Sequence, residues 1–510
     1  MKKTRSQNVI RNMWVGTMFQ MISLLLGFVS RTIFIKILGS EYLGLNSLFT
    51  NILTVLSFAE LGIGNAIIFS MYKPLANNDM TKLKKLTNFY RETYKKIAFV
   101  IIIVGLITTP FIPFIIKNTP NISESIYLIY IIFLFDTSVS YFFSYRTSII
   151  TADQKNYIII TYTYVFKIVQ IILQLTTLYF THNYILYLIL QVLNTIITQS
   201  FLAHKSKKMY PELVKVKGEE LEKNERKTIF TNVKALFIYK FSSVILNGTD
   251  SIIISKYLGL TILGLYSNYY LIVNSLALII SQIQNAFTSS VGNLIAKENA
   301  TKEKKIFNEL FYFTGLIYCV VGSCAYLLFN DFITIWLGKE YLLSNFVVAM
   351  IVGHLCFNGM LFATFTFRNT AGEFNHFKFA PVMSAFVNII LSIWFAKIMG
   401  LGGIFLATIV ARAISSGWTD PYIVYKYVFK SSVMDYVVRC VKMILRLSVC
   451  FVISYFISRY IIVSNLLTFI LKAIVLLIIS FSSYIVLSFK TKEFIGIKNA
   501  IVFLINKRRK

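Results

Sequence analysis

The sequence predicts an all-α, multi-pass membrane protein, and three observations support this. Hydrophobic residues make up 56% of the 510 residues and charged residues only 14%, against about 25% charged residues in an ordinary soluble domain. Leu, Ile, Val and Phe recur in runs of roughly 20 residues, the length a helix needs to cross the hydrocarbon of a bilayer. The basic residues lie mostly in short segments between these runs, where they orient a membrane protein.

Fourteen membrane-spanning helices are predicted, one from each apolar run. Their approximate ranges are 12–38, 43–70, 96–117, 124–150, 157–180, 184–203, 230–256, 262–295, 307–330, 344–367, 378–399, 402–426, 439–461 and 465–489. The longest polar segment between spans carries HKSKKMYPELVKVKGEELEKNERK and follows the sixth span. An even number of spans places both ends of the chain on the same side of the membrane.

The distribution of Lys and Arg predicts the orientation of these spans. With the N-terminus in the cytoplasm, the inward-facing segments hold 37 basic residues and the outward-facing loops hold 5. Cytoplasmic loops carry such an excess of positive charge. We therefore expect both termini to be cytoplasmic and the net charge of +29 to reflect membrane topology, not nucleic-acid binding. The expected location is the cell (cytoplasmic) membrane.

An internal repeat divides the predicted spans into two lobes. Residues 36–47 read KILGSEYLGLNS and residues 256–267 read KYLGLTILGLYS, with seven identical positions at an offset of 220. A second pair, TADQKN at 151–156 and TAGEFN at 370–375, matches at an offset of 219. Both pairs fall at equivalent places, so each lobe contains six helices related by a pseudo-two-fold axis.

The repeat and the charged linker together predict four parts of the chain. They are an N-terminal lobe at 1–205, a cytoplasmic linker at 206–229, a C-terminal lobe at 230–430, and two further helices with a basic cytoplasmic tail at 431–510. Paired lobes of this kind are common in secondary transporters.

Polar residues in the first helix of each predicted lobe indicate a central cleft. Gln20 and Arg31 belong to a polar stripe in span 1, and Lys240, Asn247 and Asp250 belong to the corresponding stripe in span 7. A charge at bilayer depth costs about 2.5–3.5 kcal/mol on insertion scales, so it faces a cavity or a partner. A water-filled cleft that binds an anion explains the two cations, although hydrogen bonds between packed helices remain an alternative.

Glu60 in span 2 is a further candidate for the central cleft, and basic residues near the span ends suggest an entry route. Glu60 precedes two glycines in the segment Glu60-Leu-Gly-Ile-Gly-Asn65, which is consistent with a hinge, a bent helix, a cation site or plain helix packing. Near the cytoplasmic ends of spans lie four basic residues, Lys73, Arg91, Arg146 and Arg368. They either reach toward lipid head groups or attract phosphate from the inner leaflet.

Enzymatic chemistry finds no support in the sequence. We find neither a GxxxxGK[ST] nucleotide loop nor an HExxH zinc motif. The four histidines are scattered, and the five cysteines lie in apolar runs without a CxxC pair. We therefore expect no enzyme, no metal centre and no cofactor, and any uphill transport would use an ion such as Na⁺ or H⁺, whose identity the sequence leaves open.

The order and placement of several segments resemble a known group of transporters. These segments are SRTIFIKILGSEYLGLNSLFTNILTVLSFAELGIGNAI at 30–67, YKPLANND and FYRETYKK after span 2, TADQKNYI at 151–158, and DSIIISKYLGLTILGLYSNYYLI at 250–272. The chain resembles the Wzx-type polysaccharide flippases, within the superfamily that also contains the MATE multidrug exporters and the lipid II flippase MurJ. The resemblance extends over nearly the whole chain.

The resemblance implies a pair of six-helix lobes, alternating access, and an undecaprenyl-pyrophosphate-linked oligosaccharide as substrate. It implies basic residues in a central cavity, a place that Arg31 matches in span 1. Polysaccharide polymerases and glycosyltransferases would be the expected partners, in addition to the lipid bilayer. Alternative functions are a MATE-like exporter of small molecules, a lipid II flippase and a membrane-bound polymerase.

Overall fold

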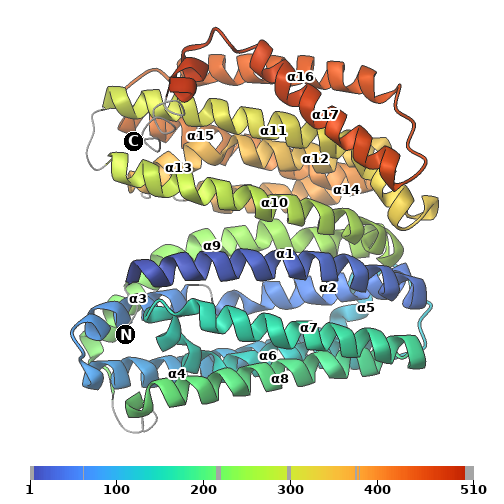
Figure 1. The fold of residues 1–510 in the computed structure, drawn as a ribbon. Helices are drawn as coiled ribbons and strands as arrows, with labels where there is room; N and C mark the ends of the chain where they lie inside the picture. The colour runs from blue at the N-terminus through green and yellow to red at the C-terminus, as the bar shows by residue number, and fades with distance from the viewer. Residues whose placement is uncertain are drawn as a thin grey trace. The chain divides into compact units, whose positions relative to one another are not determined.

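The described part of the chain is built from α-helices, as the sequence predicts. The computed structural model describes residues 5–60, 62–213, 220–295, 300–373, 376–377 and 379–499, and no β-strand occurs among them. The chain forms two compact units, Met1–Gly264 and Leu265–Lys510. Within each unit the long helices run roughly parallel to one another (Figure 1).

The first unit contains a bundle in which helices distant in sequence pack side by side. Its helices are α1 (Arg5–Leu38), α2 (Ser40–Leu56), α3 (Ile63–Ala76), α4 (Met80–Thr108), α5 (Ile112–Ile115), α6 (Ile126–Ala152), α7 (Asn156–Thr181), α8 (Tyr184–Met209) and α9 (Lys223–Tyr257). Helix α1 packs against α7, α6 packs against both α4 and α8, and α9 packs against α2 and α3. Helix α6 is therefore central to this unit.

The second predicted span is broken in its middle. Helix α2 ends at Leu56, a 3-10 turn covers Ser57–Glu60, and α3 begins at Ile63. Gly62 adopts a left-handed conformation with φ of 89°, which glycine tolerates without the steric cost that a Cβ atom would bring. The sequence left several possibilities open for this segment, and the structure shows a helix that is broken beside Glu60. Transporters use broken helices to expose main-chain groups to a cavity.

The second unit has a similar succession of long helices and two additional C-terminal ones. Its helices are α10 (Leu260–Ile295, whose first residues belong to the first unit), α11 (Ala300–Trp336), α12 (Asn345–Met360), α13 (Phe362–Thr370), α14 (Ala380–Ala413), α15 (Ser416–Ile423), α16 (Met434–Ser458) and α17 (Leu466–Val486). A further helical segment covers residues 492–499. Helices α16 and α17 pack against each other and against α11.

The described helices are compatible with fourteen spans. Eleven helical stretches among the described residues are long and apolar enough to cross a membrane, and one of them runs over 49 residues from Ala380 to Val428. Gly400 interrupts that stretch with φ of 62° and ψ of −141°, so it corresponds to the two predicted spans on either side. The broken second span and α9 correspond to the remaining two.

The backbone supports the internal repeat at the turn between the first two helices of each set. Gly39 joins α1 to α2 with φ of 86°, and Gly259 joins α9 to α10 with φ of 102°. These two glycines are separated by the offset of 220 that the sequence predicts. The same positive-φ conformation is needed at both, because each turn reverses the chain between two long helices within a few residues.

A reciprocal contact joins the two copies of this motif. A Cβ atom on Gly44 would lie 2.2 Å from the carbonyl oxygen of Leu260, and one on Gly264 would lie 2.1 Å from that of Ser40. Residues 40 and 44 correspond to residues 260 and 264 at the repeat offset, so each glycine contacts the partner motif at the same position. Absence of a Cβ lets the first turns of α2 and α10 approach this closely.

The compact units do not coincide with the predicted lobe boundaries. The predicted linker ends at residue 229, whereas the first compact unit extends through α9 to Gly264. The reason is that α9 packs on α2 and α3. The assignment of spans to lobes remains a prediction.

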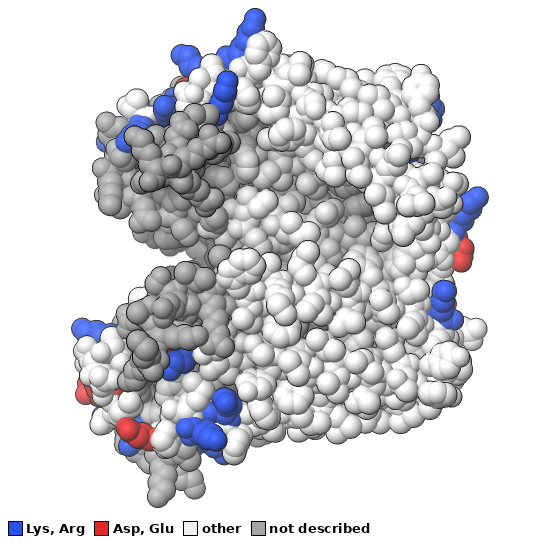
Figure 2. All heavy atoms as spheres, viewed as in Figure 1, with Lys and Arg blue, Asp and Glu red and all other residues white. Residues whose placement is uncertain are grey.

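Charged side chains avoid the middle of the visible surface. On the face shown in Figure 2, the coloured Lys, Arg, Asp and Glu side chains lie toward the helix ends in each unit, and the surface between them is uncharged. Many large apolar side chains of the long helices are exposed, including Ile103 on α4, Ile172 on α7 and Ile390 on α14. Such a band is what hydrocarbon would cover in a multi-pass membrane protein.

Candidate functional site

The predicted site residues of α1, Gln20 and Arg31, both lie within the membrane span Trp14–Leu38. Gln20 and Arg31 are both half-buried. The guanidinium of Arg31 lies close enough to the phenolic group of Tyr187 on α8 for the two groups to interact electrostatically, and Tyr187 also hydrogen-bonds Ser30. The structure therefore places the Arg31 guanidinium beside a polar group of α8 in the first unit.

The predicted residues of α9 are only partly described. Asp250 is buried, with 8% of its surface exposed. The side chains of Lys240 and Asn247 lie outside the described residues. The cleft to which all these residues were assigned remains a prediction.

A polar track follows one face of α6 inside the first unit. One part of this track is a cavity of about 280 Å³. Asp136 lines it together with hydroxyl groups of α2 and with Gln191 of α8. The amide of Gln191 donates a hydrogen bond to Asp136 over 2.8 Å, and the ammonium group of Lys167 on α7 interacts with the same carboxylate. Two helices thus supply partners that lower the cost of burying the Asp136 charge.

One helical turn along α6, a second cavity of about 350 Å³ surrounds Glu60. The hydroxyl of Tyr94 on α4 donates a 2.5 Å hydrogen bond to the Glu60 carboxylate, and Tyr90 stacks on Tyr94 with ring centroids 4.3 Å apart. A Cβ atom on Gly64 would lie 2.2 Å from the Tyr94 hydroxyl. The glycine after the helix break is therefore what allows the tyrosine to reach the carboxylate.

Hydroxyl groups of α6 complete the wall of this second cavity. Ser140, Ser144, Thr147 and Ser148 each donate to a carbonyl oxygen three or four residues earlier in the same helix. Because the donor is used within the helix, each hydroxyl presents its oxygen lone pairs to the cavity. Carboxylate and hydroxyl oxygens together suit a cation, a proton or the hydroxyl groups of a sugar.

The residues assigned to an entry route lie in different surroundings. On the first unit, Lys73 is exposed in the last turn of α3, Arg91 on α4 donates to Asn88 over 2.9 Å, and Arg146 on α6 donates to Tyr145 over 2.9 Å. On the second unit, Arg368 is buried, pairs with Asp420, and donates to the carbonyl oxygen of His376 over 3.0 Å. These contacts of Arg368 anchor the segment after α13, which distinguishes it from the other three.

Sequence reasoning did not single out the hydroxyl-rich face of α6, Tyr94, or the ion pair of Lys472 with Asp331 (2.7 Å) between α17 and α11. The serines and threonines on α6 recur at residues 137, 140, 144, 147, 148 and 151. Steps of three and four residues keep them on one helix face. This periodicity is the feature of the sequence that could have identified the polar face. The same unit holds all the described members of the predicted cleft.

Comparisons with known proteins agree with this architecture. The chain is similar in structure to the lipid II flippase MurJ in an inward closed conformation, with a TM-score of 0.62 and 15% identity over 93% of this chain and 97% of that chain. It is also similar to an inward-facing multidrug resistance MATE family transporter of the MOP superfamily, with a TM-score of 0.59 and 13% identity over 80% of this chain and 96% of that chain.

A third similar structure is the Vibrio cholerae MATE transporter VcmN in its bent form, with a TM-score of 0.54 and 13% identity over 84% of this chain and 98% of that chain. No curated protein matches the sequence. The fold is thus one found in membrane transporters of this superfamily. A family model described as polysaccharide biosynthesis protein matches residues 9–291, more than half of the chain, and the protein therefore belongs to that family.

Proposed function

We propose that this protein flips an oligosaccharide linked to undecaprenyl pyrophosphate from the cytoplasmic to the outer leaflet by alternating access. The flipped units would supply the synthesis of a capsule, an exopolysaccharide or a related surface polysaccharide. Membership of the polysaccharide biosynthesis family and a MurJ- and MATE-like fold support a transporter of this class.

One observation carries the choice of an anionic substrate. Arg31 keeps a guanidinium group inside an apolar span and turns it toward polar groups of the first unit. Retaining such a cation costs stability, and a planar guanidinium matches the oxygens of a phosphate. Arg31 is therefore the residue that would bind the pyrophosphate, with Lys240 as its partner and Gln20, Asn247, Asp250 and Glu60 as further polar groups.

Lipid II is the second candidate cargo, because the structural similarity to the lipid II flippase MurJ covers 93% of this chain. It shares the polyprenyl pyrophosphate and differs in its sugar. A small-molecule exporter like the MATE proteins is less consistent with a cationic site. Glycosyltransferases and a polysaccharide polymerase would be the partners that make and consume the flipped lipid.

Reconstitution into proteoliposomes tests this proposal. A fluorescent oligosaccharide on polyprenyl diphosphate would be loaded into both leaflets, and a membrane-impermeant quencher would report how quickly inner-leaflet lipid reaches the outside. We expect Arg31→Ala to reduce flipping at least tenfold and Arg31→Lys to restore only part of it, because an ammonium group cannot bind phosphate in a bidentate manner.

Lys36→Ala provides the matched control, because Lys36 is an exposed cation on the same helix. Wild-type flipping of lipid II, with no flipping of the oligosaccharide lipid, would transfer the proposal to the second candidate. Unchanged flipping of both lipids by Arg31→Ala, in protein of normal yield, would refute the role of Arg31.

A further inference from the structure

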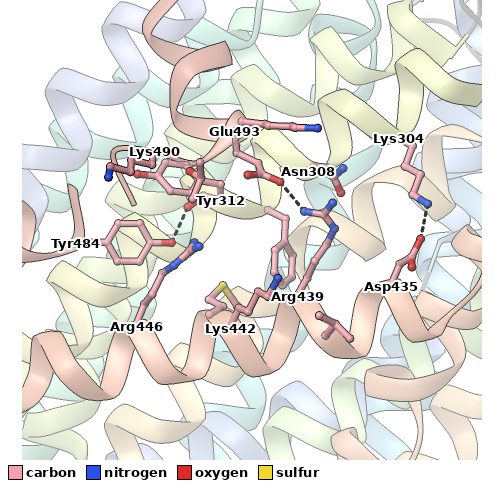
Figure 3. A pocket seen from close by; sticks show the side chains of 15 residues that line it. Lys304, Asn308, Tyr312, Asp435, Arg439, Lys442, Arg446, Tyr484, Lys490 and Glu493 are labelled. Atoms are coloured by element: carbon pink, nitrogen blue, oxygen red, sulfur yellow. Dashed lines mark hydrogen bonds and ion pairs between the residues drawn. The ribbon is translucent and has the colours of Figure 1, made fainter. Parts of the chain in front are cut away.

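A cavity of about 530 Å³ lies between α11, α16, α17 and the helical segment 492–499 in the second unit (Figure 3). It is separate from the polar track of the first unit. The helices that form it meet at the ends predicted to be cytoplasmic, where α11 and α16 begin and α17 ends. The cavity is therefore expected to open at the level of the inner-leaflet head groups.

The cavity is strongly basic. Among the described residues, six cations line it: Lys304, Arg439, Lys442, Arg446, Lys490 and Lys492; the carboxylates among these described lining residues are Asp435 and Glu493. Among its described lining residues, six cations against two carboxylates leave a surplus of four positive charges. Surface charges of one sign in a concave site focus the electrostatic potential and attract a counter-ion.

Two ion pairs hold the walls of the cavity together. Lys304 on α11 donates to Asp435 on α16 over 2.6 Å. Arg439 on α16 donates to Glu493 of the segment 492–499, also over 2.6 Å. Each pair joins two elements, so these four charges are used within the protein.

The other four cations remain for a ligand. No carboxylate of the described residues lies within 4.0 Å of Lys442, Arg446, Lys490 or Lys492. Arg439, Lys442 and Arg446 recur at steps of three and four residues, so they share one face of α16, and Figure 3 shows them projecting toward the cavity. Excess cations held this close together repel one another unless an anion binds between them.

Arg446 brings positive charge to the cavity from well inside α16. It lies twelve residues into α16, which corresponds to about 18 Å along the helix at 1.5 Å per residue. Its guanidinium lies against the hydroxyl group of Tyr484, and that hydroxyl donates to the carbonyl oxygen of Tyr312 over 3.2 Å. The tyrosine fixes the position of the Arg446 guanidinium, so the wall of the cavity holds a cation in place and is more than a charged surface.

Helix α16 also presents an apolar side chain in the wall of the cavity. Val438 lines the cavity and is 44% exposed. It is placed to contact an acyl or prenyl chain while an attached head group occupies the basic cavity. This combination distinguishes a lipid from a free phosphate ion.

We propose that the cavity formed by α11, α16, α17 and the segment 492–499 binds the head group of a lipid that carries two phosphate charges. Basic pockets between membrane helices on the cytoplasmic side bind multiply phosphorylated head groups of this kind. Four available cations match a doubly charged head group better than a singly charged one. Two lipids share this chemistry, a polyprenyl diphosphate and a bilayer phospholipid with two phosphates. The site does not require that the protein flips either one.

Binding to the full-length protein in detergent would test this site. The probes are undecaprenyl diphosphate, cardiolipin, phosphatidylglycerol with one phosphate, and inorganic pyrophosphate without a chain. The variant is the double substitution Lys442→Gln with Arg446→Gln. Lys95→Gln with Lys96→Gln removes two exposed cations from the same predicted side of the membrane and serves as the control.

We expect the cavity variant to bind the preferred two-phosphate lipid about 30-fold more weakly, from about 1 kcal/mol for each removed cation and 1.4 kcal/mol for each factor of ten. The control should change by less than about threefold. A loss with undecaprenyl diphosphate assigns the site to a polyprenyl lipid, and a loss with cardiolipin assigns it to a bilayer phospholipid.

Three results would overturn the proposal: unchanged binding of both two-phosphate lipids, an equal loss with phosphatidylglycerol, or wild-type binding of inorganic pyrophosphate as tight as that of the lipids. A second variant, Lys490→Gln with Lys492→Gln, provides the test if the first variant fails to fold. Both residues are exposed, so their substitution should not disturb folding. It should weaken two-phosphate lipid binding in the same direction. This experiment measures binding and not transport. A negative result would therefore refute the lipid site without refuting the proposed flippase function.

Discussion

Replacing Gly44 or Gly264 with alanine should separate the first turns of α2 and α10. An added Cβ atom would lie 2.2 Å from the carbonyl oxygen of Leu260 in one case and 2.1 Å from that of Ser40 in the other. Ordinary contacts of a Cβ begin near 3.4 Å, so each substitution requires a displacement of roughly 1.2 Å. The atom met is main-chain oxygen in both cases, which cannot turn away as a side chain can.

The expected cost follows from two opposing terms. Alanine is favoured over glycine in a helix by about 1 kcal/mol, whereas overpacking a close contact costs about 1–3 kcal/mol. Gly27→Ala in α1 should gain the helix preference of alanine without an overpacking cost, because no neighbouring atom lies within 4 Å of its added Cβ. The difference between Gly44→Ala and Gly27→Ala therefore isolates the contact, at about 1–3 kcal/mol.

Thermal unfolding in one detergent, followed by fluorescence-detected size exclusion, would compare the variants. Gly27→Ala should unfold at or above the wild-type temperature, and Gly44→Ala and Gly264→Ala should both unfold below it by similar amounts. Their double variant should cost less than the sum, because one displacement relieves both contacts. Equal unfolding temperatures for Gly44→Ala and Gly27→Ala would refute the reciprocal contact.

Two further predictions concern charged groups of the second unit. Asp420→Asn should destabilise the protein by about 3–5 kcal/mol, because it leaves Arg368 buried without its counter-charge. The control is Glu220→Gln, at an exposed ion pair of the first unit, which should cost no more than about 1 kcal/mol. Equal losses of thermal stability in the two variants would contradict the buried pair. Burial by itself would raise the pKa of Glu493, but the hydrogen bond and charge of Arg439 hold that pKa below its ordinary value of 4.5. The docking of the helical segment that carries Glu493 should therefore be fully stabilised above pH 4.5 and weaken as the pH falls through the lower, folded pKa. Hydrogen exchange of that segment, corrected for intrinsic rates, should show this loss, and an equal pH dependence in Glu493→Gln would disprove it.

The sequence alone was sufficient for the class of protein, the positions of most helices and the repeat. Long apolar runs can only be satisfied in lipid as helices, since every main-chain hydrogen bond must be made within the segment. The offset of 220 pairs Gly39 with Gly259, and both glycines have positive φ. Such features depend on residues close in sequence, which is why pattern and spacing reveal them.

Polar residues whose partners are distant in sequence required the tertiary structure. Arg368 was indistinguishable from the other basic residues at span ends until Asp420, 52 residues later, was found to pair with it. Glu60 could be recognised as a buried acid, but its partner Tyr94 comes from another helix. Side-chain pairing depends on which helix faces pack together, and apolar helices of similar composition do not specify that locally.

The basic cavity illustrates the same limit. The cations of α16 are visible in the sequence as a stripe at residues 439, 442 and 446, and there they have the ordinary interpretation of residues that anchor a helix end in the cytoplasm. Only the packing of α16 against α11 and α17, with the segment 492–499 across it, encloses them with Lys490 and Lys492 in one cavity. Charge is a property of single residues, whereas a binding site requires that several of them be brought within reach of one ligand.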